Sequence, residues 1–260
     1  MPEVHPTAIV SSEAELAEGV VIGPWCTVSG KVRIGPGTKL IAQVHLQGPL
    51  EIGRSNTLYP GACVGFAPQD HSFDPDEDGA GTVVGDDNVL REGVTIHRAT
   101  AAHPTTLGSH NYLMAGSHMA HDVRVGSHCT MANGTLLAGH VEVADQVTMG
   151  GAGGVQQYCR VGRLAMVGGV LKLVQDMPPF CLARYTAEVA GLNIVGLRRA
   201  GYRDHIRPLR RAMNILYHGQ HTNAEAADRI NRELGDDPLC SEFAEFIRTT
   251  TRGISGLAQA

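Results

Sequence analysis

Two histidines and an aspartate stand close together in the stretch AGSHMAHDVRVG (residues 115–126), where no helical pattern surrounds them: His118, His121 and Asp122. The unperturbed pKa of histidine lies near neutrality, so an imidazole suits the role of a general base. A neighbouring carboxylate can orient the ring and stabilise its charged form. The three residues predict an acid–base site. The alternative is that they are ordinary surface residues in a chain with 13 histidines.

A repeat of six residues indicates where these side chains lie. Aliphatic residues occupy every sixth position in three runs. The residues in phase are Val4, Val10, Leu16, Ile22, Val28, Ile34, Leu40, Leu46, Ile52, Leu58 and Val64; Val84, Leu90 and Ile96; and Leu107, Leu113, Met119, Val125, Met131, Leu137, Val143, Met149, Val155, Val161, Val167 and Leu173. Neither an α-helix nor an alternating strand has six as its period, whereas short strands joined by sharp corners do.

Three hexads make one triangular coil of 18 residues, and successive coils stack at a strand spacing of about 4.8 Å. We expect one residue of each hexad to point inward, so that the aliphatic residues form three ladders inside a prism. The residue after each inward position is often glycine, as at Gly23 and Gly126. Glycine suits corners where a Cβ would clash or where φ is positive. The predicted fold class is mainly β, a β-helix of hexapeptide repeats.

The repeat places the histidines on the outside of this prism. Neither His118 nor His121 falls on an inward position. Because residues eighteen apart stack, His140 is expected beside His121 and His97 about one coil below. A column of outward imidazoles near one edge is the arrangement that a site would need.

Two breaks interrupt the repeat, and a third marks its end. The acidic, Gly- and Pro-rich segment 67–81 predicts a loop projecting from a corner, and a shorter disruption surrounds residues 99–104. Long loops on rigid scaffolds often carry function, although a tolerated surface insertion is the alternative. The repeats end near residues 175–180, where two prolines cannot continue a central ladder.

A helical pattern follows from about Gly201. An apolar face, a capping box and a Pro-initiated third helix predict a small helical domain that caps the prism. The residues concerned are Ile206, Leu209, Met213 and Leu216 for the first helix, Thr222 and Glu225 for the capping box, Asp237 and Pro238 for the third helix, and Gly253 for its end. We therefore predict a β-helix over residues 1–190 and an α-helical domain over residues 191–260.

Composition excludes several classes of function. A net charge of −5 gives no electrostatic reason to expect nucleic-acid binding. No apolar run approaches the ~20 residues of a membrane span, and the N-terminus MPEVHPTAIV lacks the features of a signal peptide. The six cysteines form no CxxC pair, which favours reduced thiols in a cytoplasmic protein.

Six segments, in order and followed by the helical tail, resemble a known family: HPTAIV, IGPWCTV, TIHRAT, HMAHDVRVG, LAGHVEV and GLNIVGLRRAGY. They are similar to the acyl-ACP:UDP-N-acetylglucosamine O-acyltransferases that begin lipid A synthesis, and the resemblance covers essentially the whole chain. It implies a left-handed β-helix and a homotrimer with sites between subunits. It also implies transfer of a 3-hydroxyacyl chain from acyl carrier protein to the 3-hydroxyl of a UDP-sugar.

The resemblance also implies roles for the residues at the predicted edge. His121 would be the general base and Asp122 its charge partner, while His118 and His140 would position the sugar and the acyl group. The backbone N–H of Gly139 would stabilise the oxyanion of the tetrahedral intermediate. No acyl-enzyme, cofactor or metal is implied.

Further residues are expected to contact substrate: Gln69, Asp70, His71, His97, Gln156, Gln157, Gly169, Asn193, Arg198 and Arg199. Gly169 matches the position that ends the acyl groove, where a glycine leaves room for a longer chain; a simple corner glycine is the alternative. Asn193 and Arg199 match positions used for the nucleotide. The remaining arginines of residues 198–211 could dock an acidic carrier protein or form a solvated helix face.

The chain departs from the family pattern mainly on the sugar-nucleotide side. Ser72 replaces a lysine, Gln156 and Thr186 replace histidines, Val195 replaces an acid and Ala200 replaces an arginine. A paralogue that acylates another nucleotide sugar, including an amino sugar, therefore remains open.

Two other classes of function also remain open. One is a zinc enzyme like the γ-class carbonic anhydrases, with His118, His121 and either His97 or His140 as ligands. The other is a non-enzymatic trimer that binds a nucleotide sugar or a carrier protein.

Overall fold

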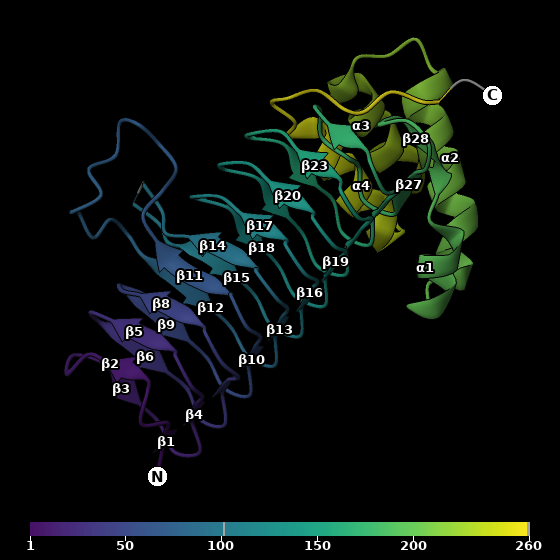
Figure 1. Ribbon diagram of the computed structural model, residues 1–260. Helices are drawn as coiled ribbons and strands as arrows, with labels where there is room; N and C mark the ends of the chain where they lie inside the picture. The colour runs from purple at the N-terminus through teal and green to yellow at the C-terminus, as the bar shows by residue number, and fades with distance from the viewer. Residues whose placement is uncertain (101, 259–260) are drawn as a thin grey trace.

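The computed structural model describes residues 1–100 and 102–258. Short strands form a column of stacked coils that starts at the N-terminus, and the helices gather at the other end (Figure 1). The strands are β1 (Glu3–Val4), β2 (Ile9–Val10), β3 (Glu15–Leu16), β4 (Val21–Ile22), β5 (Thr27–Ser29), β6 (Val32–Ile34), β7 (Lys39–Leu40), β8 (His45–Gln47), β9 (Leu50–Ile52), β10 (Thr57–Leu58), β11 (Cys63–Phe66), β12 (Thr82–Val84), β13 (Val89–Leu90), β14 (Thr95–His97), β15 (Thr105–Leu107), β16 (Tyr112–Leu113), β17 (His118–Met119), β18 (Arg124–Val125), β19 (Thr130–Met131), β20 (Leu136–Leu137), β21 (Glu142–Val143), β22 (Thr148–Met149), β23 (Gly154–Val155), β24 (Arg160–Val161), β25 (Met166–Val167), β26 (Lys172–Leu173), β27 (Cys181–Ala183) and β28 (Val189–Leu192). The helices are α1 (Ile194–Arg199), a 3-10 turn η1 (Arg203–His205), α2 (Ile206–His218), α3 (Asn223–Leu234) and α4 (Pro238–Arg248).

Every third strand of the coils joins the same sheet. Sheet A contains β1 and each third strand to β25, then β27 and β28; sheet B runs from β2 to β26 and sheet C from β3 to β24. Pairing within the coils is parallel and joins residues eighteen apart, as Thr27 with His45 and Met119 with Leu137. The structure confirms the predicted β-helix and its coil of 18 residues.

The predicted aliphatic ladders fill the interior. Every in-phase residue from Ile22 to Leu173 is buried. Val4, Val10 and Leu16 are not, because they lie in the first coil and no further coil covers that end. A glycine after an inward residue keeps the coils in contact: a Cβ on Gly23 would lie 1.9 Å from the carbonyl oxygen of Ile41.

The expectation of one inward residue per hexad is wrong, because two point inward. The second stands two positions before the first, on the same side of the extended chain, as Val94 does before Ile96. In the column of sheet A, three consecutive members are buried asparagines: Asn56, Asn88 and Asn111. The side-chain oxygen of Asn56 accepts from the backbone N–H of Asn88 at 2.9 Å, and that of Asn88 accepts from Asn111 N–H at 2.9 Å. This ladder satisfies polar groups that the interior would otherwise leave unpaired.

Both insertions leave the prism from one ridge. We call the turns from sheet B to sheet C the B–C corner; in the regular coils they are residues 120–123, 138–141 and 156–159. The loop 67–81 joins β11 to β12 and projects from the column (Figure 1), as predicted. The insertion at 99–104 joins β14 to β15 at the same corner, one coil further on. Two enlarged corners therefore stand directly before the coil that carries His121.

The helical end differs from expectation in two places. It begins before Gly201, because α1 already starts after Asn193, whose side chain accepts from Gly196 N–H at 3.0 Å. The predicted capping box of α3 is present. However, α4 ends at Arg248, so Gly253 does not close it as expected.

Two arginines of the last coils fasten the helices to the prism. Arg160 donates to buried Asp176 at 3.1 Å and to the carbonyl oxygen of Phe246 in α4 at 2.9 Å. Arg163 pairs with Glu242 of α4 at 2.6 Å. The helices thus cover the end of the prism, as predicted. The domain boundary between residues 190 and 191 stays a prediction and falls inside β28.

The helices of residues 1–100 and 102–258 are all too short or too polar to cross a membrane.

Candidate active site

The B–C corner of three successive coils carries the candidate site. Each coil contributes a strand of sheet B and the turn that follows it. The residues are His118, His121 and Asp122 from the first coil, Gly139 and His140 from the second, and Gln156, Gln157 and Tyr158 from the third.

His121 and Asp122 form a buried hydrogen-bonded pair. Nδ1 of His121 lies 2.7 Å from Oδ2 of Asp122, and each residue is 8% exposed. A carboxylate accepts only, so Nδ1 carries a proton, and the neutral form of this ring has its lone pair on Nε2. The pair therefore supplies a base whose orientation and tautomer are fixed.

Gly139 lies directly against the His121 ring. A Cβ on Gly139 would stand 2.6 Å from Cε1 and 2.8 Å from Nε2 of that ring, so a side chain here would displace the imidazole. Among the described residues no acceptor receives the Gly139 N–H. A free backbone donor therefore lies beside the basic nitrogen, as stabilisation of an oxyanion requires.

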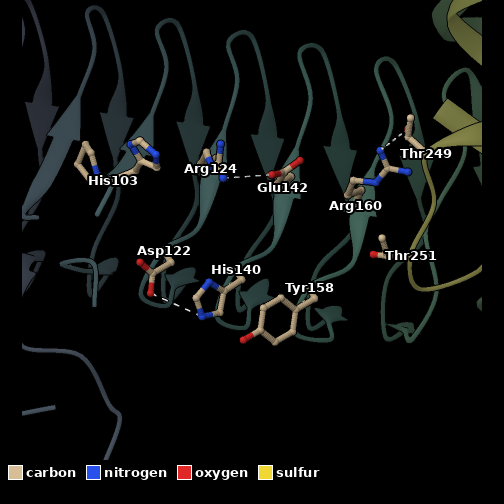
Figure 2. A pocket seen from close by; sticks show the side chains of 10 residues that line it. His103, Asp122, Arg124, His140, Glu142, Tyr158, Arg160, Thr249 and Thr251 are labelled. Carbon is tan, nitrogen blue, oxygen red and sulfur yellow. Dashed lines mark hydrogen bonds and ion pairs between the residues drawn. The ribbon is translucent and has the colours of Figure 1, made fainter. Parts of the chain in front are cut away.

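His140 extends the site along the corner. Its Nε2 lies 3.7 Å from Oδ2 of Asp122, and its ring meets that of His121 edge-on with centroids 5.2 Å apart. On its other side it stacks on Tyr158, with the rings 4.5 Å apart and nearly parallel. Figure 2 shows Asp122, His140 and Tyr158 side by side on successive coils. Sequence reasoning missed Tyr158, although its distance of eighteen residues from His140 could have found it.

His118 and His97 form a second pair of rings below the base. Their centroids are 5.2 Å apart, and Nδ1 of His118 lies 2.7 Å from the hydroxyl of Thr95. Burial, with smaller contributions from His97 and His121, lowers the pKa of His118 to about 4. Burial also lowers the pKa of His97. His118 is therefore neutral at pH 7 and can act as a hydrogen-bonding group rather than as a charge.

A groove of about 600 Å³ opens on the sheet B side of the corner. His121 and Gly139 both contribute to its wall. The other polar residues that line it are Gln69, His118, Gln156, Gln157 and Lys172. A substrate in this groove would meet the base and the free N–H together.

A smaller cavity of about 370 Å³ lies on the sheet C side (Figure 2). Asp122, His140 and Tyr158 form one wall, and Arg124 and Glu142, 3.4 Å apart, lie on the other. The corner thus separates two hollows; His121 lines the groove and His140 lines the smaller cavity.

Part of the projecting loop 67–81 lies against the groove. Gln69 lines it, and Asp70 lies within electrostatic reach of His121. Hydrogen bonds from Ser72 N–H at 2.9 Å and Ser72 Oγ at 2.8 Å chiefly lower the pKa of Asp70, and His121 and His71 add to this effect. His71 itself is exposed and lines neither hollow.

Four predicted substrate contacts lie away from the groove in the single chain. Gly169 is exposed at a turn from sheet A to sheet B, and Arg198 and Arg199 are exposed on α1. Asn193 uses its amide to hold α1, because Oδ1 accepts from Gly196 and Nδ2 donates to the Leu164 carbonyl at 3.0 Å. None of the four lines either hollow.

The same corner brings together potential metal ligands. One ligand atom each from His121, Asp122 and His140 lie within 4.8 Å of one another. However, Oδ2 of Asp122 already accepts from Nδ1 of His121 at 2.7 Å and from the hydroxyl of Thr100 at 2.6 Å. The donor set is therefore arranged as a hydrogen-bonded base rather than as an open metal cradle.

Comparison with known proteins identifies the family. Residues 176–255 match the family model described as Udp N-acetylglucosamine O-acyltransferase, Domain 2. The chain is 42% identical to the acyl-(acyl-carrier-protein)--UDP-N-acetylglucosamine O-acyltransferase of Thermodesulfovibrio yellowstonii, over 98% of this chain and 99% of that protein. It is 39% identical to the enzyme of the same name from an Anaeromyxobacter species, over 97% of this chain and 99% of that protein.

Solved structures agree with this assignment. LpxA from Acinetobacter baumannii is 35% identical and superposes with a TM-score of 0.94, covering 97% of this chain and 99% of that chain. The UDP-N-acetylglucosamine O-acyltransferase of Moraxella catarrhalis is 32% identical with a TM-score of 0.92, and the coverage is again 97% and 99%. The chain therefore belongs to the family of acyl-(acyl-carrier-protein)--UDP-N-acetylglucosamine O-acyltransferases.

Proposed function

We propose that this protein moves a 3-hydroxyacyl chain from acyl carrier protein to the 3-hydroxyl of UDP-N-acetylglucosamine, the first step of lipid A synthesis. The observation that carries the proposal is the juxtaposition of a carboxylate-bound imidazole and a free backbone N–H in one groove. An acyl transfer needs both groups within reach of one carbonyl carbon. The names of the full-length relatives support the choice of donor and acceptor.

The chemistry needs no acyl-enzyme. Nε2 of His121 takes the proton of the sugar hydroxyl as its oxygen attacks the thioester carbonyl carbon. The carbonyl oxygen becomes an oxyanion that accepts a hydrogen bond from Gly139 N–H. Collapse of the tetrahedral intermediate breaks the carbon–sulfur bond, and the imidazolium returns its proton to the leaving thiolate. Asp122 stabilises the charged ring between the two proton transfers.

The groove offers neutral hydrogen-bonding groups for the sugar. His118, Gln69 and the pair Gln156 and Gln157 line it around the base. Neutral donors and acceptors suit an uncharged sugar ring and its hydroxyls. Lys172 is the cation at the groove wall and suits a phosphate of the nucleotide.

We further propose a homotrimer in which a neighbouring subunit completes the site. Asn193, Arg198 and Arg199 bind the nucleotide in this proposal, yet they lie away from the groove of their own chain. The outward side of sheet C carries ion pairs such as Arg33 with Glu15 at 3.1 Å, which suits a solvent face. From β10 to β25 the outward side of sheet A carries half-buried uncharged residues, which suits a subunit contact: Thr57, Val89, Tyr112, Thr130, Thr148 and Met166. An acyl-carrier donor would place this activity in the cytoplasm.

The test is a direct assay of the purified protein. Carrier proteins loaded with 3-hydroxyacyl chains of several lengths are mixed with a panel of UDP-sugars, and products are identified by mass spectrometry. We expect an ester of UDP-N-acetylglucosamine. An amide on an amino sugar would overturn the acceptor while keeping the transfer, and no acylated sugar with any donor would overturn the enzyme.

Gly169 adds a specificity arm to the same assay. A Cβ at this position would lie 3.1 Å from the carbonyl oxygen of Gly151, so a larger side chain must extend outward from the turn. We expect Gly169→Met to shift the preferred acyl chain to a shorter one with little change in the rate for that chain. An unchanged length preference would remove Gly169 from the acyl groove.

A further inference from the structure

We infer that Thr100 is a positioning residue for the base, acting through Asp122; this inference rests on the proposed function. The side-chain hydroxyl of Thr100 donates to Oδ2 of Asp122 at 2.6 Å. Its backbone N–H also faces the carboxylate, 3.2 Å from Oδ1 and 3.3 Å from Oδ2. One residue thus contacts both oxygens of the carboxylate that holds His121.

The shared oxygen gives the hydroxyl its importance. Oδ2 of Asp122 accepts from Nδ1 of His121 at 2.7 Å and from Thr100 at nearly the same distance. The Asp122 side chain is only 6% exposed, so water cannot readily replace a lost donor. Together with the other donors to this carboxylate, the hydroxyl orients the carboxylate and, through it, the plane of the imidazole.

The insertion at 99–104 explains how Thr100 reaches this place. In a regular coil, the residue beneath a B–C corner lies eighteen positions earlier in the chain. Here the coil is longer, because Thr95 pairs with His118, and Thr100 contacts Asp122 across 22 residues. Thr105, at the end of the insertion, receives the backbone N–H of Asp122 on its hydroxyl at 2.8 Å. Asp122 is therefore held by Thr100 on its carboxylate and by Thr105 on its backbone N–H.

Removal of the hydroxyl has a predictable signature in kinetics. Thr100→Val keeps the shape of the side chain and the backbone N–H but deletes the donor to Oδ2. We expect kcat to fall by about 10-fold to 50-fold, a part of the roughly 10²- to 10⁴-fold that a general base contributes. The KM for the UDP-sugar should change by less than about twofold, because Thr100 lines neither the groove nor the smaller cavity.

The pH profile separates positioning from a merely structural role. Without the hydrogen bond from Thr100, more of the negative charge of Asp122 faces His121. The carboxylate then stabilises the protonated imidazole more strongly. The acidic limb of kcat/KM against pH should therefore move to higher pH in Thr100→Val. Thr100→Ser keeps the hydroxyl donor, so its kcat and the position of its acidic limb should be close to those of the wild type.

The experiment compares these variants in the acyl-transfer assay, with Thr106→Val as the matched control. Thr106 lies on β15, six residues away, and its hydroxyl makes no hydrogen bond among the described residues. In an Asp122→Asn background, adding Thr100→Val should lower kcat by less than about twofold further, since both changes act through the same carboxylate. Melting temperatures and oligomeric state are measured for each variant.

Wild-type kcat in Thr100→Val, or a loss in Thr100→Ser as large as in Thr100→Val, overturns the inference. Additive losses in the double variant also overturn it. His121→Ala distinguishes a failure of the proposed function from a failure of the inference about Thr100. If His121→Ala keeps full activity, the proposed base fails together with the inference; if it is inactive while Thr100→Val is normal, the inference alone fails.

Discussion

At the scale of single residues, the environment of each histidine decides what it can do. The carboxylate of Asp122 orients the imidazole of His121, the proposed base, whereas burial keeps His118 neutral at pH 7. Spacing along the chain predicted that these imidazoles and His140 would gather on one ridge, because stacking repeats every eighteen residues. It could not predict Thr100, since the irregular insertion breaks that spacing just where the contact forms.

The depressed pKa of His118 makes stability depend on pH. An unfolded chain protonates this histidine near pH 6.5, whereas the folded chain does so at about 4. Between these values the unfolded state binds more protons, so stability falls as pH drops from 6.5 toward 4. We expect His118→Gln to flatten this decline, measured by urea unfolding at pH 7, 6, 5 and 4.5. His5→Gln, in the exposed first coil, is the control, and an unchanged slope in His118→Gln would contradict the assignment.

At the scale of elements, the prism was predictable because its inward residues repeat with constant chemistry. The second inward residue of each hexad was not predicted because these residues vary in kind, from Val94 to Asn88 and Asn111. The polar ones are satisfied only by neighbours one coil away, which no local pattern reveals. The short helix α1 was not predicted because its N-cap, Asn193, was interpreted only as a nucleotide contact.

The attachment of the helices to the prism depends on Asp176. This residue is fully buried, accepts from Arg160 N–H at 2.8 Å and Nε at 3.1 Å, and accepts from the hydroxyl of Thr250 at 2.8 Å. Asp176→Ala removes the carboxylate that pairs with the Arg160 guanidinium, and we expect the free energy of unfolding to fall by about 3 kcal/mol. Asp176→Asn keeps part of the hydrogen bonding, so it should lower the free energy of unfolding by less than Asp176→Ala does. Denaturant unfolding measures both, and equal stability of Asp176→Ala and wild type would show that this buried pair does not fasten the domain.

At the scale of the whole molecule, the groove of one chain is lined by the proposed base but not by every predicted substrate contact. The groove at the B–C corner and the arginines of α1 stand on different parts of the surface. A trimer with parallel prism axes would bring a neighbour's edge to each groove. In the proposed trimer, that edge would cover part of the groove of the single chain.

Mixed oligomers test whether sites are shared between subunits. Homo-oligomers of His121→Ala and of Arg199→Ala should each have low activity. After the two variants are unfolded together and refolded, about a quarter of the shared sites should carry both native residues, with a matching return of activity. Mixing without refolding is the control. No recovery, with mixed oligomers confirmed by native mass spectrometry, would place both residues in one subunit's site.

The most direct test of the account is the rate of acyl transfer by His121→Ala. The variant is compared with wild type and with His128→Ala, which alters an exposed histidine at a different corner. We predict a loss of at least about 10²-fold in kcat for His121→Ala, with the β-helix and its oligomeric state intact and no loss in the control. Transfer by His121→Ala at the wild-type rate would contradict the account, because no general base would then act at the B–C corner as described.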